Sequence, residues 1–130
     1  MTARDGDYTV LVIDDDPLYR QTLQDMLGVG GYRALGARNG EDGLAVFAAN
    51  AVDLVVCDLL MPVKEGIETI IELRRAQPQT RIIAVSGGGN LGFGVNLEVA
   101  RELGADAVLA KPIRSAELLT LVARLLDGSV

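Results

Sequence analysis

Residues 52–58, with the sequence VDLVVCD, form a short apolar run that is rich in valine and ends in Asp58. An apolar run of this length with β-branched residues is typical of a buried strand. Asp58 therefore falls at the carboxyl end of a predicted strand, where open parallel sheets place the crevice that binds their ligands. Because an unpaired charge beside buried apolar residues is costly, we expect this carboxylate to have a chemical role.

A second apolar run, residues 8–13, ends in the pair Asp14 and Asp15. If the two strands belong to one sheet, three carboxylates converge at the same edge. Like charges held close together raise one another's pKa unless a cation or a proton lies among them. The sequence therefore predicts a site for a divalent metal or a site where carboxylates share a proton.

Apolar strand-like runs alternate with segments of helical period along the whole chain. The predicted strands are residues 8–13, 33–37, 54–57, 81–85 and 107–109. Each is followed by a predicted helix: one capped by Asp16 and ended by Gly28, Gly30 and Gly31, one after Asn39-Gly40, one from near Gly66 to before Pro78, one bearing Val99, Ala100 and Leu103, and one over residues 115–126. This alternation indicates an α/β fold with a parallel sheet covered by helices on both sides.

The inner faces of the predicted helices follow from their apolar spacing. They comprise Tyr19, Leu23, Met26 and Leu27 in the first helix, Ile67, Ile70 and Ile71 in the third, and Leu118, Leu121, Val122 and Leu125 in the last. With 130 residues we expect one domain, with a core over about residues 8–127.

The amino-acid composition argues against several classes of function. The net charge is −6 and no run of basic residues occurs, which argues against direct binding to nucleic acid. The chain has no histidine, the commonest general base, and its single cysteine, Cys57, is expected in the core. No apolar stretch reaches the roughly 20 residues of a membrane span, and the polar start is no signal peptide, so we expect a soluble, cytoplasmic protein that does not bind membranes.

Two more polar residues follow strands that end at the same edge, Ser86 and Lys111. Carboxylates, a hydroxyl and an amine can together hold Mg²⁺ and a phosphoryl group. An ionised carboxylate is itself a nucleophile for phosphoryl transfer, so Asp58 needs no general base and the lack of histidine costs nothing.

Four motifs carry a resemblance to a known family: VIDDDP at residues 12–17, DLLMPVKEG at 58–66, VSG at 85–87 and AKP at 110–112. Together and in this order they resemble the receiver domain of two-component response regulators, over essentially the whole chain. The resemblance implies a single doubly wound sheet of five parallel strands, in the order 2-1-3-4-5, with five flanking helices.

The resemblance also implies roles for individual residues. Asp58 is the implied phosphoacceptor. Asp14 and Asp15 are implied to hold Mg²⁺ with Asp58 and the backbone carbonyl of Leu60. The switch hydroxyl is that of Ser86.

Lys111 is implied to bond a phosphoryl oxygen, before a cis peptide bond to Pro112. The implied donors are a histidine kinase, a histidine phosphotransfer protein or a small phosphodonor such as acetyl phosphate. The implied output is control of a downstream protein effector through the face around the fourth and fifth βα units. Such a protein is not an enzyme in the usual sense, but a stoichiometric phosphoacceptor that assists its own phosphorylation and dephosphorylation.

Some positions depart from the family pattern. Val108 occupies the place where many relatives carry a rotating aromatic, so we expect the switch to use backbone or loop movement. Residues 87–94 form a longer, glycine-rich loop with Phe93 as a candidate apolar latch. Leu60 and Gly88 fill the positions that tune dephosphorylation, and neither side chain can position a water, which predicts slow hydrolysis.

Two other functions stay open at this point. An Mg²⁺-dependent phosphohydrolase with an aspartate nucleophile is the main alternative, although such enzymes usually carry a second acid where this chain has Leu60. A binding module is the other, since residues 87–92 match the dinucleotide pattern G-x-G-x-x-G. The sequence does not decide between a stand-alone protein and an excised domain, and it leaves the oligomeric state open.

Overall fold

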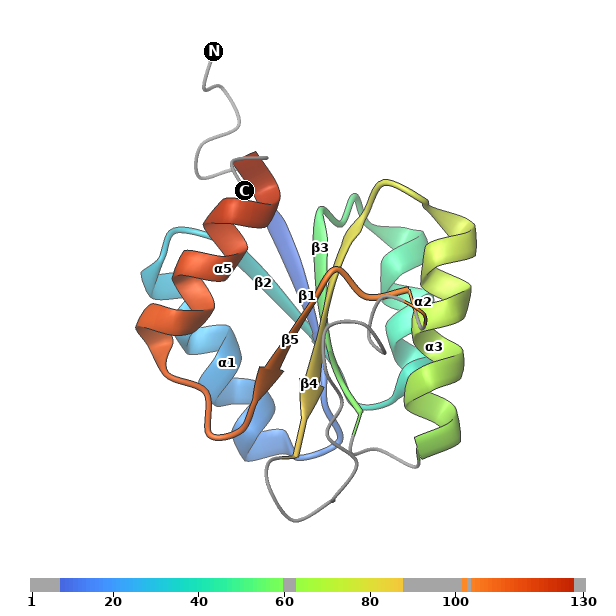
Figure 1. The fold of residues 1–130 in the computed structure, drawn as a ribbon, viewed down its shortest axis with the longest axis horizontal. Coiled ribbons are helices and arrows are strands. Elements are labelled where there is room, and N and C mark those ends of the chain that lie inside the picture. The colour runs from blue at the N-terminus through green and yellow to red at the C-terminus, as the bar shows by residue number, and fades with distance from the viewer. Residues whose placement is uncertain (1–7, 60–62, 88–101, 103, 128–130) are drawn as a thin grey trace.

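A computed structural model of the chain describes residues 8–59, 63–87, 102 and 104–127. Five parallel strands form one sheet in the order β2-β1-β3-β4-β5, as predicted. They are β1 (Thr9–Ile13), β2 (Arg33–Ala37), β3 (Leu54–Asp58), β4 (Arg81–Ser86) and β5 (Ala107–Ala110). The carboxyl ends of all five strands therefore meet along one edge of the sheet (Figure 1).

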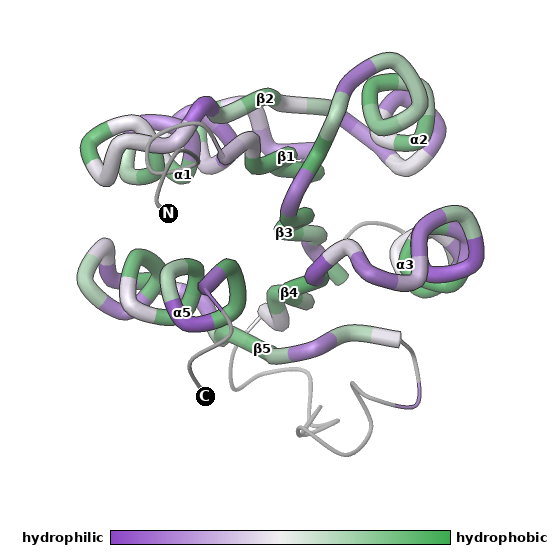
Figure 2. Tube along the Cα trace, turned by 90° about the horizontal axis from the view of Figure 1, so that it is seen from above, coloured by the Kyte–Doolittle hydropathy of each residue, from purple (hydrophilic) through white to green (hydrophobic). Residues whose placement is uncertain are grey.

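Helices cover both faces of this sheet. The described helices are α1 (Pro17–Val29), α2 (Gly40–Ala49), α3 (Val63–Ala76) and α5 (Ser115–Asp127). Figures 1 and 2 show α1 and α5 on one side of the sheet and α2 and α3 on the other, which is the doubly wound α/β arrangement. The predicted helix bearing Val99, Ala100 and Leu103 falls largely outside the described residues.

The alternation of side chains along β1 divides the core in two. Val10 and Val12 join the apolar cluster under α1 and α5, whereas Leu11 and Ile13 join the one under α2 and α3. All four are fully buried, as expected for a central strand covered on both faces. The apolar strands appear in green between the two helical layers in Figure 2. The apolar runs thus form the centre of the molecule and hold its strand ends rigidly.

The start of α1 follows the sequence prediction. Asp16 is the N-cap and its carboxylate accepts hydrogen bonds from the backbone N–H groups of Leu18 and Tyr19, with Pro17 at the first helical position. Of the three glycines predicted to end this helix, Gly30 is the C-cap, whereas Gly28 lies inside the helix. Gly31, with φ of 93°, makes the left-handed turn that follows.

In α3 the predicted inner face is partly wrong. Ile70 is fully buried, but Ile71 is 37% exposed and Leu73 is buried in its place. The helix also begins at Val63, three residues before the predicted start near Gly66. The face that packs on the sheet includes Gly66, Ile70 and Leu73, whose steps of four and three match the helical period, whereas Ile71 lies one step off it.

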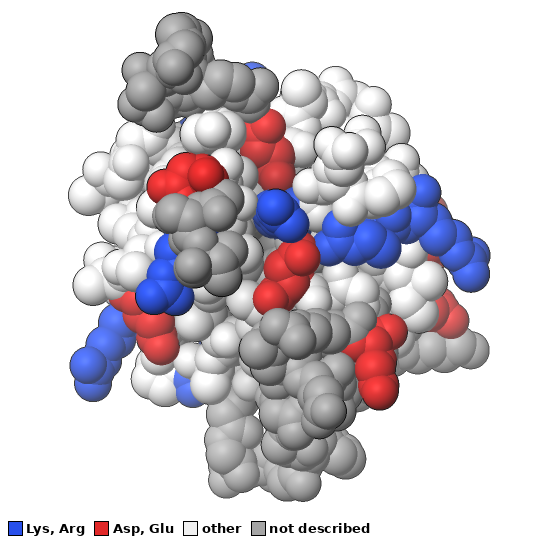
Figure 3. All heavy atoms as spheres, turned by 45° about the horizontal axis from the view of Figure 1, so that its top comes forward, with Lys and Arg blue, Asp and Glu red and all other residues white. Residues whose placement is uncertain are grey.

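At the opposite edge of the sheet, Arg74 of α3 fastens the segment that leads into β5. Its guanidinium donates hydrogen bonds to the backbone carbonyls of Gly104, Pro78 and Thr80, at 2.6–3.1 Å. It also forms an ion pair of 2.8 Å with Asp106. Figure 3, which brings this edge forward, shows acidic and basic side chains lying next to one another there. The network fixes the position of the start of β5. It thereby also fixes the carboxyl end of β5, which lies at the other edge of the sheet together with the carboxyl ends of the other strands.

Candidate functional site

The predicted carboxylates do converge. Asp14 directly follows β1 and Asp58 is the last residue of β3, a residue later than the predicted strand end. Asp14 and Asp58 are 1% and 2% exposed, and Asp15 is exposed beside them. One carboxylate oxygen from each of the three lies within 4.8 Å of the others. The group is therefore compact enough to share a single cation.

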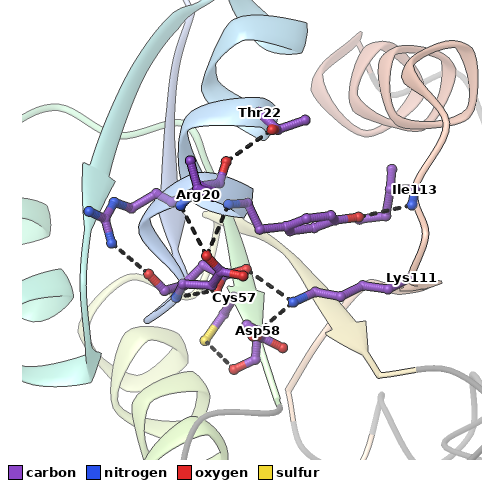
Figure 4. Close-up of polar contacts among 10 residues, drawn as sticks. Arg20, Thr22, Cys57, Asp58, Lys111 and Ile113 are labelled. Carbon is purple, nitrogen blue, oxygen red and sulfur yellow. Dashed lines mark hydrogen bonds and ion pairs between the residues drawn. The ribbon is translucent and has the colours of Figure 1, made fainter.

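Lys111 reaches into this acid group from the connection between β5 and α5. Its Nζ lies 3.2 Å from Oδ2 of Asp58 and 3.3 Å from Oδ2 of Asp14. Figure 4 shows the side chain extended toward Asp58 at the end of β3. The base of the side chain is fixed as well, because the backbone N–H of Lys111 donates to the carbonyl of Ser86 at 3.0 Å. The lysine is thus the immediate counter-charge of two buried carboxylates.

The charge of Lys111 is stabilised by this position. Burial acts to lower its pKa, but the attraction of Asp58 and Asp14 and the hydrogen bond to Asp58 outweigh the burial and raise the pKa above its ordinary value. The ammonium is consequently charged at neutral pH. The three carboxylates outnumber the ammonium of Lys111 and the nearby guanidinium of Arg20, so the described part of the site keeps an excess of negative charge.

Asp14 carries a buried oxygen that suits a metal ion. Its Oδ1 accepts a hydrogen bond from the backbone N–H of Asp16 at 2.9 Å. Its Oδ2 makes no hydrogen bond among the described residues, and the ammonium of Lys111 lies 3.3 Å from it as an ion pair. A buried acceptor left in this state is costly unless another group engages it. A hard divalent cation bound by oxygen atoms fits both this atom and the all-carboxylate donor set.

The backbone of Asp14 is held from two sides. Its N–H donates to the carbonyl of Ala37 in β2 at 3.1 Å, and its carbonyl accepts from Nη1 of Arg20 in α1 at 2.8 Å. Because both partners come from regular elements, the loop after β1 is fixed before any ligand binds. This rigidity favours a preformed site.

Ser86 is brought to the same edge by the sheet register. It ends β4, one residue beyond the predicted strand, and pairs with Ala110. Asp58 pairs with Val85 in the adjacent ladder between β3 and β4, so Asp58 and Ser86 come from neighbouring strand ends. The Lys111–Pro112 peptide bond is cis, as predicted.

Other predicted features fall outside the described residues. They are Leu60, whose backbone carbonyl is a predicted metal ligand, and Gly88 and Phe93 of the glycine-rich loop. Cys57 is buried and not in a disulfide, as predicted. None of the described helices is long and apolar enough to cross a membrane.

One residue of the site was missed by sequence reasoning. Tyr19 was predicted only as a core residue of the first helix, and it does pack against the core. Its ring also lies under the ammonium of Lys111, with Nζ 4.3 Å from the ring centroid, and its hydroxyl accepts a hydrogen bond from the backbone N–H of Ile113. Nothing in the helical spacing distinguishes such a tyrosine from an ordinary core residue.

Comparison with known proteins agrees with this geometry. Residues 10–123 match the model of the response regulator receiver domain, so the chain belongs to this family. It is 35% identical over 120 residues to the transcriptional regulatory protein CpxR of Klebsiella pneumoniae, covering 92% of this chain and 50% of that protein. It is 42% identical over 79 residues to the autoinducer 1 sensor kinase/phosphatase LuxN of Vibrio campbellii, covering 61% of this chain and 9% of LuxN. The chain thus spans about half the length of CpxR.

Solved structures show the same architecture. The CheY-like receiver domain protein of Methanospirillum hungatei superposes with a TM-score of 0.82 at 27% identity, covering 93% of this chain and 94% of that one. The response regulator TrrA of Thermotoga maritima, solved in complex with Mg²⁺ and beryllofluoride, gives a TM-score of 0.78 at 30% identity, covering 92% of this chain and 99% of TrrA. As a receiver domain of a bacterial-type two-component system, the chain is a signalling module with an acid group that could bind a metal.

Proposed function

We propose that this receiver is a phosphorylation switch in which Asp58 accepts one phosphoryl group from a histidine kinase or a histidine phosphotransfer protein. The observation that carries the proposal is the contact of the buried Asp58 carboxylate with Lys111, beside Asp14 and Asp15. The sensor kinase LuxN contains a segment similar to this chain, which supports a kinase as the donor.

Mg²⁺ is the proposed metal, and the beryllofluoride complex of the relative TrrA supports it. The residues that would hold it are Asp14, Asp15 and Asp58, together with the backbone carbonyl of Leu60. When bound, the ion offsets the repulsion between these carboxylates and an incoming phosphoryl group. Oδ2 of Asp14, which is buried and makes no hydrogen bond among the described residues, is a candidate ligand atom for this ion.

The proposed transfer uses groups of this chain that are already in place. A carboxylate oxygen of Asp58 forms the new bond to phosphorus, while the bond from phosphorus to the donor's histidine nitrogen breaks and its electron pair returns to that nitrogen. Lys111 then bonds a phosphoryl oxygen, and the hydroxyl of Ser86 moves toward the same group. The reaction is stoichiometric, because Leu60 stands where an aspartate-nucleophile hydrolase has its second acid and cannot transfer a proton.

The proposed output passes through the face around β4 and β5. An open cavity of about 820 Å³ lies between β5 and α5 and reaches Ser86 at one end. Val108 lines this cavity at the position where many relatives carry an aromatic. Movement of Ser86 toward the phosphoryl group therefore displaces the backbone and changes the shape of the cavity. A downstream protein effector binds differently to the two shapes.

The test is phosphorylation by a small donor. Intact-mass spectrometry after incubation with acetyl phosphate and Mg²⁺ should show one added phosphoryl group. Asp58→Asn should remain unmodified, whereas Asp25→Asn, which alters an exposed aspartate of α1, should be modified like the wild type. Full modification of Asp58→Asn, or none of the wild type under saturating donor, would refute the proposal.

A further inference from the structure

Tyr19 contacts three parts of the site at once. Its backbone N–H donates to the N-cap carboxylate of Asp16, so its position is tied to the loop that carries the acid pair. Its ring faces the ammonium of Lys111 and its hydroxyl accepts from the backbone N–H of Ile113. One side chain of α1 thus connects the loop after β1 with the loop after β5.

The ring and the carboxylates contact the same ammonium. Nζ of Lys111 has two carboxylate oxygens at 3.2 and 3.3 Å and the ring centroid at 4.3 Å. A lysine side chain is long and flexible, so its end is not placed by its backbone alone. An aromatic face attracts the cation and also blocks part of the space into which the chain could swing.

The hydroxyl fixes the backbone that carries the lysine. Lys111 donates its N–H to Ser86, and two residues later Ile113 donates its N–H to Tyr19, at 3.0 and 2.9 Å. Ile113 is only 6% exposed, so its N–H has few alternatives to this acceptor. The segment with Lys111 is therefore held at both ends, and Tyr19 supplies one of the two anchors.

We propose that Tyr19 is a positioning residue that holds the ammonium of Lys111 between Asp14 and Asp58, ready for a phosphoryl oxygen. The inference rests on the proposed function, to which it adds a residue that touches neither metal nor phosphoryl group. In this proposal the ring of Tyr19 holds the side chain of Lys111, and the hydroxyl of Tyr19 holds the backbone segment that carries Lys111.

The chain offers a direct probe, because it contains only two lysines, Lys64 and Lys111. In protein labelled with ¹³C-lysine, NMR gives one set of ε-CH₂ signals for each, and Lys64→Arg assigns them. The ring current of Tyr19 should shift the Lys111 signals upfield. Tyr19→Phe should keep this shift, whereas Tyr19→Leu should lose it and show a more mobile lysine end.

Tyr32→Leu is the matched control. Tyr32 is half-buried and packs against the same apolar cluster, but it precedes β2 at the opposite edge of the sheet. Its replacement should lower the melting temperature about as much as Tyr19→Leu and leave the Lys111 signals unchanged. Unchanged position and mobility of the Lys111 signals in Tyr19→Leu would overturn the inference, whether or not the protein is phosphorylated.

Phosphorylation supplies a second, separate readout. With acetyl phosphate, Tyr19→Leu should react roughly two- to tenfold more slowly than the wild type at saturating Mg²⁺, as expected for loss of one cation–π contact. Tyr19→Phe should recover most of the rate, and the Mg²⁺ affinity of both variants should not fall. A general loosening of the site would instead weaken Mg²⁺ binding in Tyr19→Leu, and that result would also overturn the inference. Failure of the wild type to react at all would sink the proposed function but leave the NMR test in force.

Discussion

Nζ of Lys111 lies 3.2 Å from Oδ2 of Asp58, although the two residues are 53 positions apart in the sequence. The contact joins the end of β3 to the loop after β5 across the intervening strand β4. It places a cation against a carboxylate that is 2% exposed. Much of the behaviour of the site follows from this pair.

Removal of the lysine charge should destabilise the metal-free protein. Lys111→Met removes the ammonium that faces two buried carboxylates, and the free energy of unfolding should fall by about 3 kcal/mol. Mg²⁺ should then raise the melting temperature of the variant more than that of the wild type, since it replaces the lost charge. Urea and thermal unfolding with and without Mg²⁺ measure both effects. Arg124→Met, at an exposed position of α5, serves as the control and should change stability by less than about 0.5 kcal/mol.

The raised pKa of Lys111 predicts a loss of stability at high pH. A group whose pKa is higher in the folded state stabilises that state fully below its unfolded pKa, about 10.4 for lysine, and loses this contribution as the pH rises through the folded pKa. Metal-free wild type should therefore lose stability above about pH 10.4 more steeply than Lys111→Arg, whose guanidinium stays charged. Parallel stability curves for the two proteins, measured by urea unfolding, would show that the pair contributes nothing.

Two neighbouring aspartates should behave in opposite ways. Asp14→Asn should weaken Mg²⁺ binding by about tenfold or more, because a unit charge beside the ion is worth on the order of several kcal/mol. Asp16→Ala should leave Mg²⁺ binding intact but cost about 1 kcal/mol of stability, because it removes the N-cap of α1. Calorimetric Mg²⁺ titration and urea unfolding separate the two roles. Equal loss of Mg²⁺ affinity in both variants would contradict the assignment.

Arg74 should be essential for the edge opposite the site. Arg74→Lys cannot satisfy the carbonyls of Gly104, Pro78 and Thr80 together, and we expect a loss of about 2–4 kcal/mol in the free energy of unfolding. Arg75→Lys, the same change at the exposed neighbour, should have an effect below about 0.5 kcal/mol. If the two variants unfold at the same urea concentration, the network is not a structural anchor.

Two glycines should respond in opposite directions to alanine. Gly104 has φ of 104°, so Gly104→Ala should cost about 1 kcal/mol or more in backbone strain, although the new methyl meets only ordinary contacts at 3.5 Å. Gly28 lies within α1 with no atom near its missing Cβ, so Gly28→Ala should stabilise the protein by about 0.5–1 kcal/mol. Thermal unfolding of the two variants tests this difference.

The sequence predicted the sheet and the acid group because both depend on local patterns. Buried strands need continuous apolar runs, and parallel strands with helical crossovers bring their carboxyl ends to one edge, so Asp14 and Asp58 could be assigned to that edge from their positions alone. The face of α3 was less predictable, because three isoleucines offer more than one apolar stripe. Only packing on the sheet selects the stripe with Leu73 and leaves Ile71 exposed.

By itself the sequence determined the α/β fold class with its parallel sheet, the edge of the sheet that carries the chemistry and the types of group found there. The tertiary structure decided what each group touches: the ring of Tyr19 under Lys111, the hydroxyl of Tyr19 on Ile113 and the guanidinium of Arg74 on Gly104. The physical reason is the separation along the sequence over which each kind of interaction acts. Backbone hydrogen bonding and side-chain period act over a few residues, whereas the Tyr19–Ile113 bond spans 94 positions and exists only after the layers have packed.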